Sequence, residues 1–167
     1  MSFYKQQEFD FIDRTKKIIK QYDNLVVPKE EEKYEVTLLL NCMVGLLILP
    51  QQNWFNNLPT DLITNKSWGI DEAEIKVIKD RELKDEDKTV ANIARHLRNS
   101  IAHYRFEAFN NSKDEINSIK FEDYICCKKN NIEIKEQTFE ATINLENLQE
   151  FVYKLSNDLV SQIKKSK

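Results

Sequence analysis

Apolar residues recur at helical spacing in several well-separated stretches of the chain, which predicts a series of amphipathic helices. These stretches are residues 3–22, 86–108 and 145–165. A further stretch, residues 32–49, is apolar over most of its length and ends at Pro50, as is typical of a deeply buried helix. The clearest pattern lies in residues 86–108, whose apolar stripe consists of Val90, Ile93, Ala94, Leu97, Ile101, Tyr104 and Ala108.

Residues 115–143 have a different pattern, in which apolar and polar residues partly alternate on either side of the turn-like segment 128–131. Such alternation predicts a β-hairpin. Residues 70–84 are ambiguous between strand and helix, and residues 50–69 form a long Asn-rich connection that Trp54 and Trp68 are expected to anchor on the core. The predicted fold is mainly α: a helical bundle in one domain, residues 1–167, with the hairpin inserted before the C-terminal helix.

Composition narrows the class of protein. The 167 residues include two Gly and three Pro, and so few breakers favour long helices. A net charge of −3 argues against a broad basic coat for nucleic acid, so any nucleic-acid role must rest on a local site. Cys42, Cys126 and Cys127 form neither a disulfide framework nor a zinc motif. We expect a cytoplasmic protein with no membrane span, no metal and no cofactor.

The candidate chemistry is concentrated in residues 95–105, RHLRNSIAHYR, which hold three of the five arginines and both histidines. Arginine offers a planar fork of donors that fits a phosphate, and histidine exchanges a proton near neutral pH. Together they suit phosphodiester cleavage without a metal. A helical projection places the following residues opposite the apolar stripe: Arg95, His96, Arg98, Asn99 and His103. The alternative to a catalytic site is that these residues form the solvated polar face of an ordinary amphipathic helix. His96 lies beside a core position and is the better candidate for a structural role.

Arg98 and His103 would lie about 140° apart around a helix and roughly 7.5 Å apart along its axis. The two side chains therefore do not stack on one line. Either Arg98 leans toward His103, or the same face of a second copy supplies the missing partner.

The segment Arg98-Asn99-Ser100-Ile101-Ala102-His103 resembles the motif of the HEPN superfamily, in which Arg, a polar residue, variable residues and then His lie on a helix of a small bundle. The apolar LLLNCMVGLLILPQQ followed by an aromatic-bearing loop is similar to a plasmid- and defence-associated branch of that superfamily. The resemblance implies a metal-independent endoribonuclease, a toxin or anti-phage effector, that works as a homodimer with the two motif helices facing each other.

The resemblance also implies roles for individual residues. Arg98 would hold the scissile phosphate, and His103 would act as general base or acid to give a 2′,3′-cyclic phosphate. Asn99 would orient the phosphate or its neighbour, while Arg95 and Arg105 would hold flanking phosphates of the RNA.

One departure from the family pattern concerns tyrosine. HEPN toxins silenced by a nucleotidyltransferase antitoxin often carry Tyr two residues after the His, but here that position is Arg105 and Tyr104 follows His103 directly. Modification of Tyr104 is therefore not expected. Two alternatives remain open: a non-catalytic HEPN module that binds a nucleotide or a partner protein, and an antitoxin or immunity subunit. An antitoxin or defence-system protein is a further candidate partner.

Overall fold

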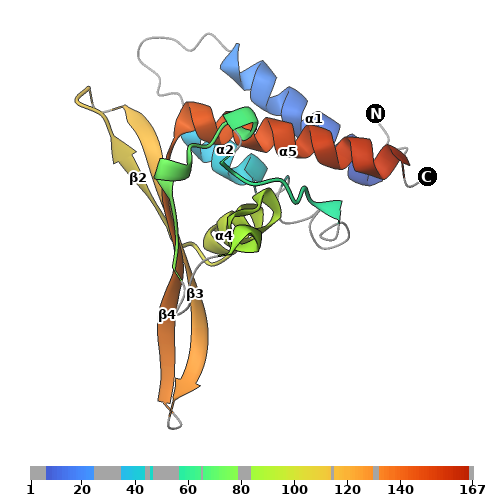
Figure 1. The fold of residues 1–167 in the computed structure, drawn as a ribbon. Coiled ribbons are helices and arrows are strands. Elements are labelled where there is room, and N and C mark those ends of the chain that lie inside the picture. Colours follow the sequence, from blue (N-terminus) through green and yellow to red (C-terminus); the bar gives the residue numbers. More distant parts are fainter. Residues whose placement is uncertain are drawn as a thin grey trace. The chain divides into compact units, whose positions relative to one another are not determined.

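The computed structural model describes residues 7–24, 35–43, 46, 57–64, 66–78, 84–113, 115–129 and 132–165 (Figure 1). The chain divides into two compact units, residues 59–151 and residues 1–58 with 152–167. The described residues form four α-helices and one four-stranded antiparallel sheet. The protein is therefore mixed α/β, and the prediction of a mainly α helical bundle is wrong. The single domain expected over residues 1–167 stays a prediction.

The sheet has the order β1-β4-β3-β2 and belongs to the unit of residues 59–151. Its centre is the pair β3 (Ile116–Lys129) and β4 (Ile132–Asn144), in a register that runs from Ser118 opposite Asn144 to Lys129 opposite Ile132. This pair confirms the predicted hairpin. Figure 1 shows the two long strands continuing well past helix α4 (Val90–Ala102). The edge strands, β1 (Ile75–Val77) and β2 (Phe106–Asn110), turn the hairpin into a sheet.

Strand β2 lies where the sequence pattern predicted the end of a helix. Helix α4 stops at Ala102, and the chain reverses through Tyr104, which has a left-handed φ of 55°. The Tyr104 N–H donates to the Ile101 carbonyl at 3.1 Å, and the Arg105 N–H donates to the Ser100 carbonyl at 2.8 Å. These two bonds define a Schellman motif, whose left-handed position is usually Gly. Because a tyrosine stands there, the sequence carries no stop signal.

The predicted apolar stripe of α4 is correct over five residues and wrong over its last two. Tyr104 is 82% exposed, and Ala108 is exposed on β2. At the other end, the first residues of the predicted helix belong to a separate 3-10 turn, η5 (Asp85–Lys88), and Thr89 caps α4. The confirmed part of the stripe is buried and consists of Val90, Ile93, Ala94, Leu97 and Ile101.

Helix α4 packs against β3, and this contact builds the core of the unit. Alternate residues of β3 and β4 point to its buried side, as a strand period of two requires. Burying such side chains contributes about 1.5–3 kcal/mol each, so this layer fixes where α4 lies on the sheet. The buried residues of the two strands are Ile119, Phe121, Phe139, Ala141 and Ile143.

The last helix, α5 (Leu145–Lys165), starts where β4 ends. The Asn144 Oδ1 accepts from the Asn147 N–H at 2.8 Å, so Asn144 caps the helix. The first residues of α5 belong to the unit just described, and the helix continues into the other unit from Val152.

The second unit contains α1 (Gln7–Asp23), α2 (Glu35–Met43) and the rest of α5. Helix α1 packs on α2, and the Tyr153 hydroxyl on α5 donates to the Lys16 carbonyl on α1 at 3.3 Å. No helix in the described ranges has the length and apolar character needed to cross a bilayer. Pro28, Pro50 and Trp54 lie outside the described residues, whereas Trp68 ends the short η3 helix (Lys66–Trp68), half-buried.

The ambiguity of residues 70–84 resolves in favour of a short strand. The 3-10 helix η4 (Glu72–Glu74) leads directly into β1, and Ile75 pairs with Ala141 of β4. The Glu74 carboxylate accepts from the Asn147 side chain at 3.0 and 3.1 Å, which fastens η4 to the start of α5.

Candidate active site at the end of helix α4

Asp123 is a buried carboxylate on β3 that faces the polar side of α4. It follows Ile119 and Phe121 at a spacing of two, so it points to the same buried side of the strand. Its carboxylate is almost completely covered, with 3% of the residue exposed. The register of β3 against β4 shifts between Asp123 and Tyr124, and this bulge lets the Tyr124 N–H donate to Asp123 Oδ1 at 2.9 Å.

Three side chains donate to this carboxylate. His96 Nδ1 and Asn99 Nδ2, both on α4, lie 2.9 and 3.0 Å from Asp123 Oδ2. Arg105 Nη1, in the connection to β2, lies 3.4 Å from Asp123 Oδ1. The buried carboxylate of Asp123 therefore links strand β3 to helix α4 and to the segment that connects α4 to β2. Ionised groups at such depth are stable only when they are paired in this way.

His96 is a structural member of this network. It is 2% exposed, and its ring stacks on the Phe139 ring with centroids 4.8 Å apart and planes 2° apart. Its Nε2 lies 3.2 Å from Arg95 Nη2. A guanidinium only donates, so Nε2 accepts and the proton sits on Nδ1, facing Asp123. Arg95 is held at its other side by Asn92 Oδ1, at 2.7 and 3.2 Å.

Arg98 is positioned by Asn99. The Asn99 Oδ1 accepts from Arg98 Nε at 3.2 Å and from Arg98 Nη2 at 2.9 Å, while its amide nitrogen donates to Asp123. Of the five N–H donors of a guanidinium, these two bonds use two, and the other three have no partner within the described ranges. The half-buried Arg98 thus presents a fixed set of open donors, which suits an anion with several oxygens.

His103 lies at the C-cap of α4 and is exposed. Its backbone N–H donates to the Asn99 carbonyl at 3.0 Å, which places it one turn beyond Asn99. Its imidazole has no hydrogen-bonding partner in the described part of the chain, and no hydrogen bond there joins it to Arg98. The structure therefore gathers Arg95, Asn99 and Arg105 around the Asp123 network and leaves His103 outside it.

Two corrections to the predicted face of α4 follow. The polar side is packed against β3, because His96 is fully buried and Arg95, Arg98 and Asn99 are half-buried. Arg105 lies past the helix end, and its guanidinium sits 5.3 Å from the centre of the Tyr124 ring. The polar residues of α4 therefore pack against the sheet, and the C-terminal end of the helix carries the exposed Ala102 and His103.

Asp123 was not among the residues predicted from the sequence. The available signal was an acid in phase with Ile119 and Phe121, on the inward side of a predicted strand. A carboxylate placed in this way needs buried donors, and His96 on the neighbouring amphipathic helix is the natural candidate.

The charge state of Asp123 reflects two opposing effects. Burial raises the pKa of this carboxyl, but the hydrogen bonds from His96, Asn99 and the Tyr124 N–H outweigh burial and lower the pKa below its usual range. The carboxylate is therefore ionised at neutral pH and serves only as an acceptor.

We expect the decrease in the free energy of unfolding at acid pH to depend on Asp123. A carboxyl whose pKa is lower in the folded chain than in the unfolded chain stabilises the fold above the unfolded pKa, about 4 for Asp. That contribution disappears as the pH falls from about 4 through the folded pKa. Urea unfolding between neutral pH and strong acid should show a shallower acid decline in Asp123→Asn than in the natural chain. If the free energy of unfolding fell equally steeply with pH in both proteins, the lowered pKa of Asp123 would be contradicted.

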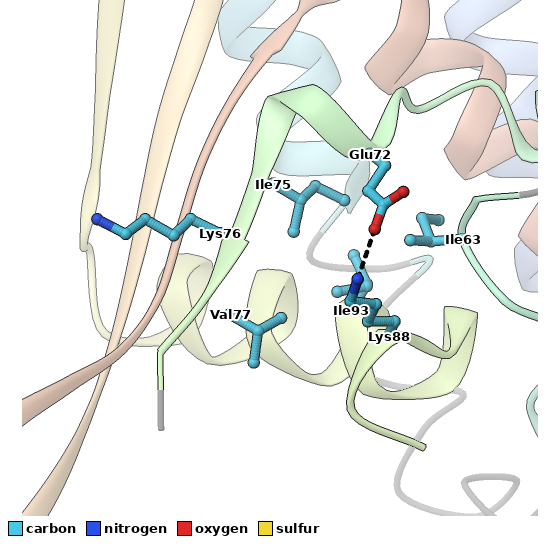
Figure 2. A pocket seen from close by; sticks show the side chains of 7 residues that line it. All are labelled: Ile63, Glu72, Ile75, Lys76, Val77, Lys88 and Ile93. Atoms are coloured by element: carbon cyan, nitrogen blue, oxygen red, sulfur yellow. Dashed lines mark hydrogen bonds and ion pairs between the residues drawn. The ribbon is translucent and has the colours of Figure 1, made fainter. Parts of the chain in front are cut away.

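Two surface hollows lie near the motif helix. The smaller, about 170 Å³, has an apolar floor and is bounded by β1 and α4. Figure 2 shows Ile75 and Val77 on the same side of β1 as Ile93, with Lys76 pointing away from them, and the ion pair of Lys88 with Glu72 at 2.6 Å. Lys88 and Glu72 neutralise each other there, and the third charged residue of its lining, Lys76, points away from the apolar side chains.

The larger hollow, about 390 Å³, opens directly after the end of α4. Its lining residues come from the connection, β2 and β3: Tyr104, Arg105, Phe106, Glu107, Lys120 and Glu122. Within the described ranges, no three His, Cys, Asp or Glu side chains are grouped so as to hold a metal ion.

The Arg98-Asn99 pair near the end of α4, followed by the exposed His103 at its C-cap, is the segment whose sequence resembles the HEPN motif. The chain belongs to this superfamily: the family model described as HEPN pEK499 p136 matches residues 1–166. Neither the curated proteins nor the solved structures gave a significant match. The match confirms the resemblance to HEPN proteins and covers nearly the whole chain.

Proposed function

We propose that the protein is a metal-independent endoribonuclease that cuts RNA at a site built from Arg98 and His103. The observation that carries the proposal is the state of Arg98. Its guanidinium is held by the Asn99 side chain, whose amide donates to Asp123. Three of its donors and the imidazole of His103, at the same helix end, have no partner among the described residues. Membership of the HEPN superfamily supports a nuclease-like or RNA-related role.

Arg98 would bind the scissile phosphate. The side-chain oxygen of Asn99 accepts from one edge of the Arg98 guanidinium, so the remaining donors of Arg98 are held in place before the substrate arrives. Donors placed in advance stabilise developing charge without reorganising during the reaction. As the 2′-oxygen approaches phosphorus, the extra negative charge on the non-bridging oxygens strengthens these hydrogen bonds.

His103 would move the proton. The ribose 2′-OH loses its proton to the imidazole as the O2′–P bond forms, and the P–O5′ bond breaks as the leaving oxygen gains a proton. The products are a 2′,3′-cyclic phosphate and a 5′-hydroxyl. The exposed imidazole has its ring nitrogens open within the described residues, so it can reach either oxygen. Arg95 would hold a flanking phosphate as a secondary contact, and Arg105, whose Nη1 is bound to Asp123, would contact a phosphate only outside the hollow and through its other donors.

A homodimer would complete the site. Within a single chain, no hydrogen bond among the described residues joins Arg98 to His103. The His103 of a second copy would then supply the proton transfer that one site lacks. In the cell the enzyme would serve as a toxin or anti-phage effector, restrained by an antitoxin or defence-system partner.

The proposal is tested by incubating the natural chain with a mixed RNA pool in EDTA and mapping the product ends. We expect cleavage that leaves 2′,3′-cyclic phosphate and 5′-hydroxyl ends, by a species that sediments as a dimer at micromolar concentration. If no RNA is cut, or if EDTA abolishes cleavage, the proposed mechanism fails. A non-catalytic HEPN module that binds nucleotides then becomes the better explanation, and a thermal shift with nucleotides would detect it.

A further inference from the structure

The hollow beside the end of α4 is formed partly by the residue that follows the motif histidine. Tyr104 is the next residue after His103, and it lines the hollow together with Phe106 and the side chains around them. Adjacent α-carbons are about 3.8 Å apart, so a group bound against Tyr104 lies close to the residue that bears the exposed imidazole.

Tyr104 occupies a strained backbone position without any gain in burial. Its φ of 55° is the left-handed conformation that Gly adopts without strain at this point of a Schellman motif. The side chain is 82% exposed, so core packing does not explain a tyrosine here. Its ring meets the Phe106 ring edge to face, with centroids 4.8 Å apart, and this contact leaves most of the tyrosine surface open.

The charges around the hollow disfavour a phosphate as its occupant. Lys120 is neutralised by Glu122 at 3.0 Å and by Glu140 at 3.2 Å, and Arg105 is bound to Asp123. The exposed Glu107 carboxylate has no partner among the described residues and would repel a phosphate. The hollow therefore suits an uncharged, flat group with hydrogen-bond donors at its edge.

We propose that an unpaired RNA base stacks on Tyr104 in this hollow, as the base of a nucleotide beside the scissile phosphate. The choice of RNA rests on the proposed function. Proteins recognise single-stranded RNA by stacking splayed bases on aromatic side chains, and such stacking tolerates any base. Donors on the edge of the base would face the Glu107 carboxylate, while its phosphates remain outside the hollow, toward Arg98.

The test measures binding of a short single-stranded 2′-O-methyl RNA to the full chain by fluorescence anisotropy. This RNA lacks the 2′-OH nucleophile, so binding can be measured even if the protein cleaves nothing. We expect Tyr104→Gly to weaken binding by about 5- to 150-fold, the range for loss of one stacked base. Tyr104→Phe keeps the aromatic face and should bind like the natural chain.

Stability separates recognition from a folding defect. Glycine relieves the left-handed strain, so Tyr104→Gly should raise the Tm by about 2–4 °C while it weakens binding. Tyr104→Asn, also tolerated at this φ, gives a second variant that lacks an aromatic face. A structural role for Tyr104 would instead lower the Tm and the binding together, and that result would overturn the proposal.

An abasic version of the same oligonucleotide distinguishes base stacking from backbone contacts. Tyr104→Gly should leave binding of the abasic strand unchanged, because that strand has nothing to stack. Equal weakening for both strands, or no weakening for either, would also overturn the proposal. These outcomes are independent of the cleavage assay, so the base-binding site can fail while the nuclease stands, and the reverse.

Discussion

Arg98→Ala is expected to slow RNA cleavage by about 10²–10³-fold, because it removes the donors that stabilise the charge developing on the phosphate. His103→Ala is expected to slow it by about 10²–10⁴-fold, the usual contribution of a positioned acid or base. Both losses should appear in kcat, since in the proposed mechanism each group acts on the transition state more strongly than on bound RNA. The measurement is single-turnover cleavage of a fixed RNA with EDTA present.

The matched control for these variants is Lys113→Ala, which removes an exposed positive charge from the turn between β2 and β3. It should leave the rate unchanged apart from a small, salt-dependent effect on binding. Arg95→Ala is a second comparison: it should mainly weaken RNA binding, in proportion to one lost phosphate contact. Undiminished cleavage by either Arg98→Ala or His103→Ala would remove that residue from the mechanism.

Asp123→Ala is expected to destabilise the fold by about 3–5 kcal/mol, because it leaves buried donors of His96, Asn99 and the Tyr124 amide without an acceptor. That is a large fraction of the free energy of unfolding of a typical domain. Urea unfolding at neutral pH measures it. Where the variant remains folded, cleavage should also fall, since Asn99 loses the bond that orients its carbonyl toward Arg98.

Two variants show whether the network causes this loss. Asp123→Asn keeps the size of the side chain and one oxygen acceptor, so it should cost clearly less than Asp123→Ala. Glu107→Ala removes an exposed carboxylate from the neighbouring strand and should change stability by no more than about 0.5 kcal/mol. If Asp123→Ala were as mild as Glu107→Ala, the carboxylate would not be the centre of the network.

The parts of the fold that the sequence predicted are those in which local pattern and tertiary contact agree. The hairpin and the buried stripe from Val90 to Ile101 follow directly from periodicity. The mainly α class was wrong because two edge strands left almost no local signal. Strand β1 is three residues long, and β2 lies in helical phase with α4 behind a turn that lacks glycine.

The candidate site shows the same division. Arg98 and His103 were predicted from residue type and spacing, and their catalytic roles stay predictions. The Asp123 network could not be predicted because it joins Asp123 to His96 and Asn99, which lie 27 and 24 positions away in sequence, through a strand bulge that no local pattern marks. Arg105 was assigned to a helix face, and its contact with Asp123 exists only because the helix has already ended.

The backbone of Arg105 is hydrogen-bonded both to helix α4 and to strand β3, and this couples the local unfolding of the two elements. Its N–H is bonded to Ser100 in the last turn of α4, and its carbonyl accepts from the Glu122 N–H of β3 at 3.0 Å. Ser100 Oγ closes the same ring by donating to the Glu122 carbonyl at 2.8 Å. The helix terminus and the β2–β3 edge therefore cannot fray separately and should open in one cooperative step. The temperature at which that edge begins to exchange its amide protons with solvent then sets the upper limit at which His103 keeps the position that the proposed reaction requires.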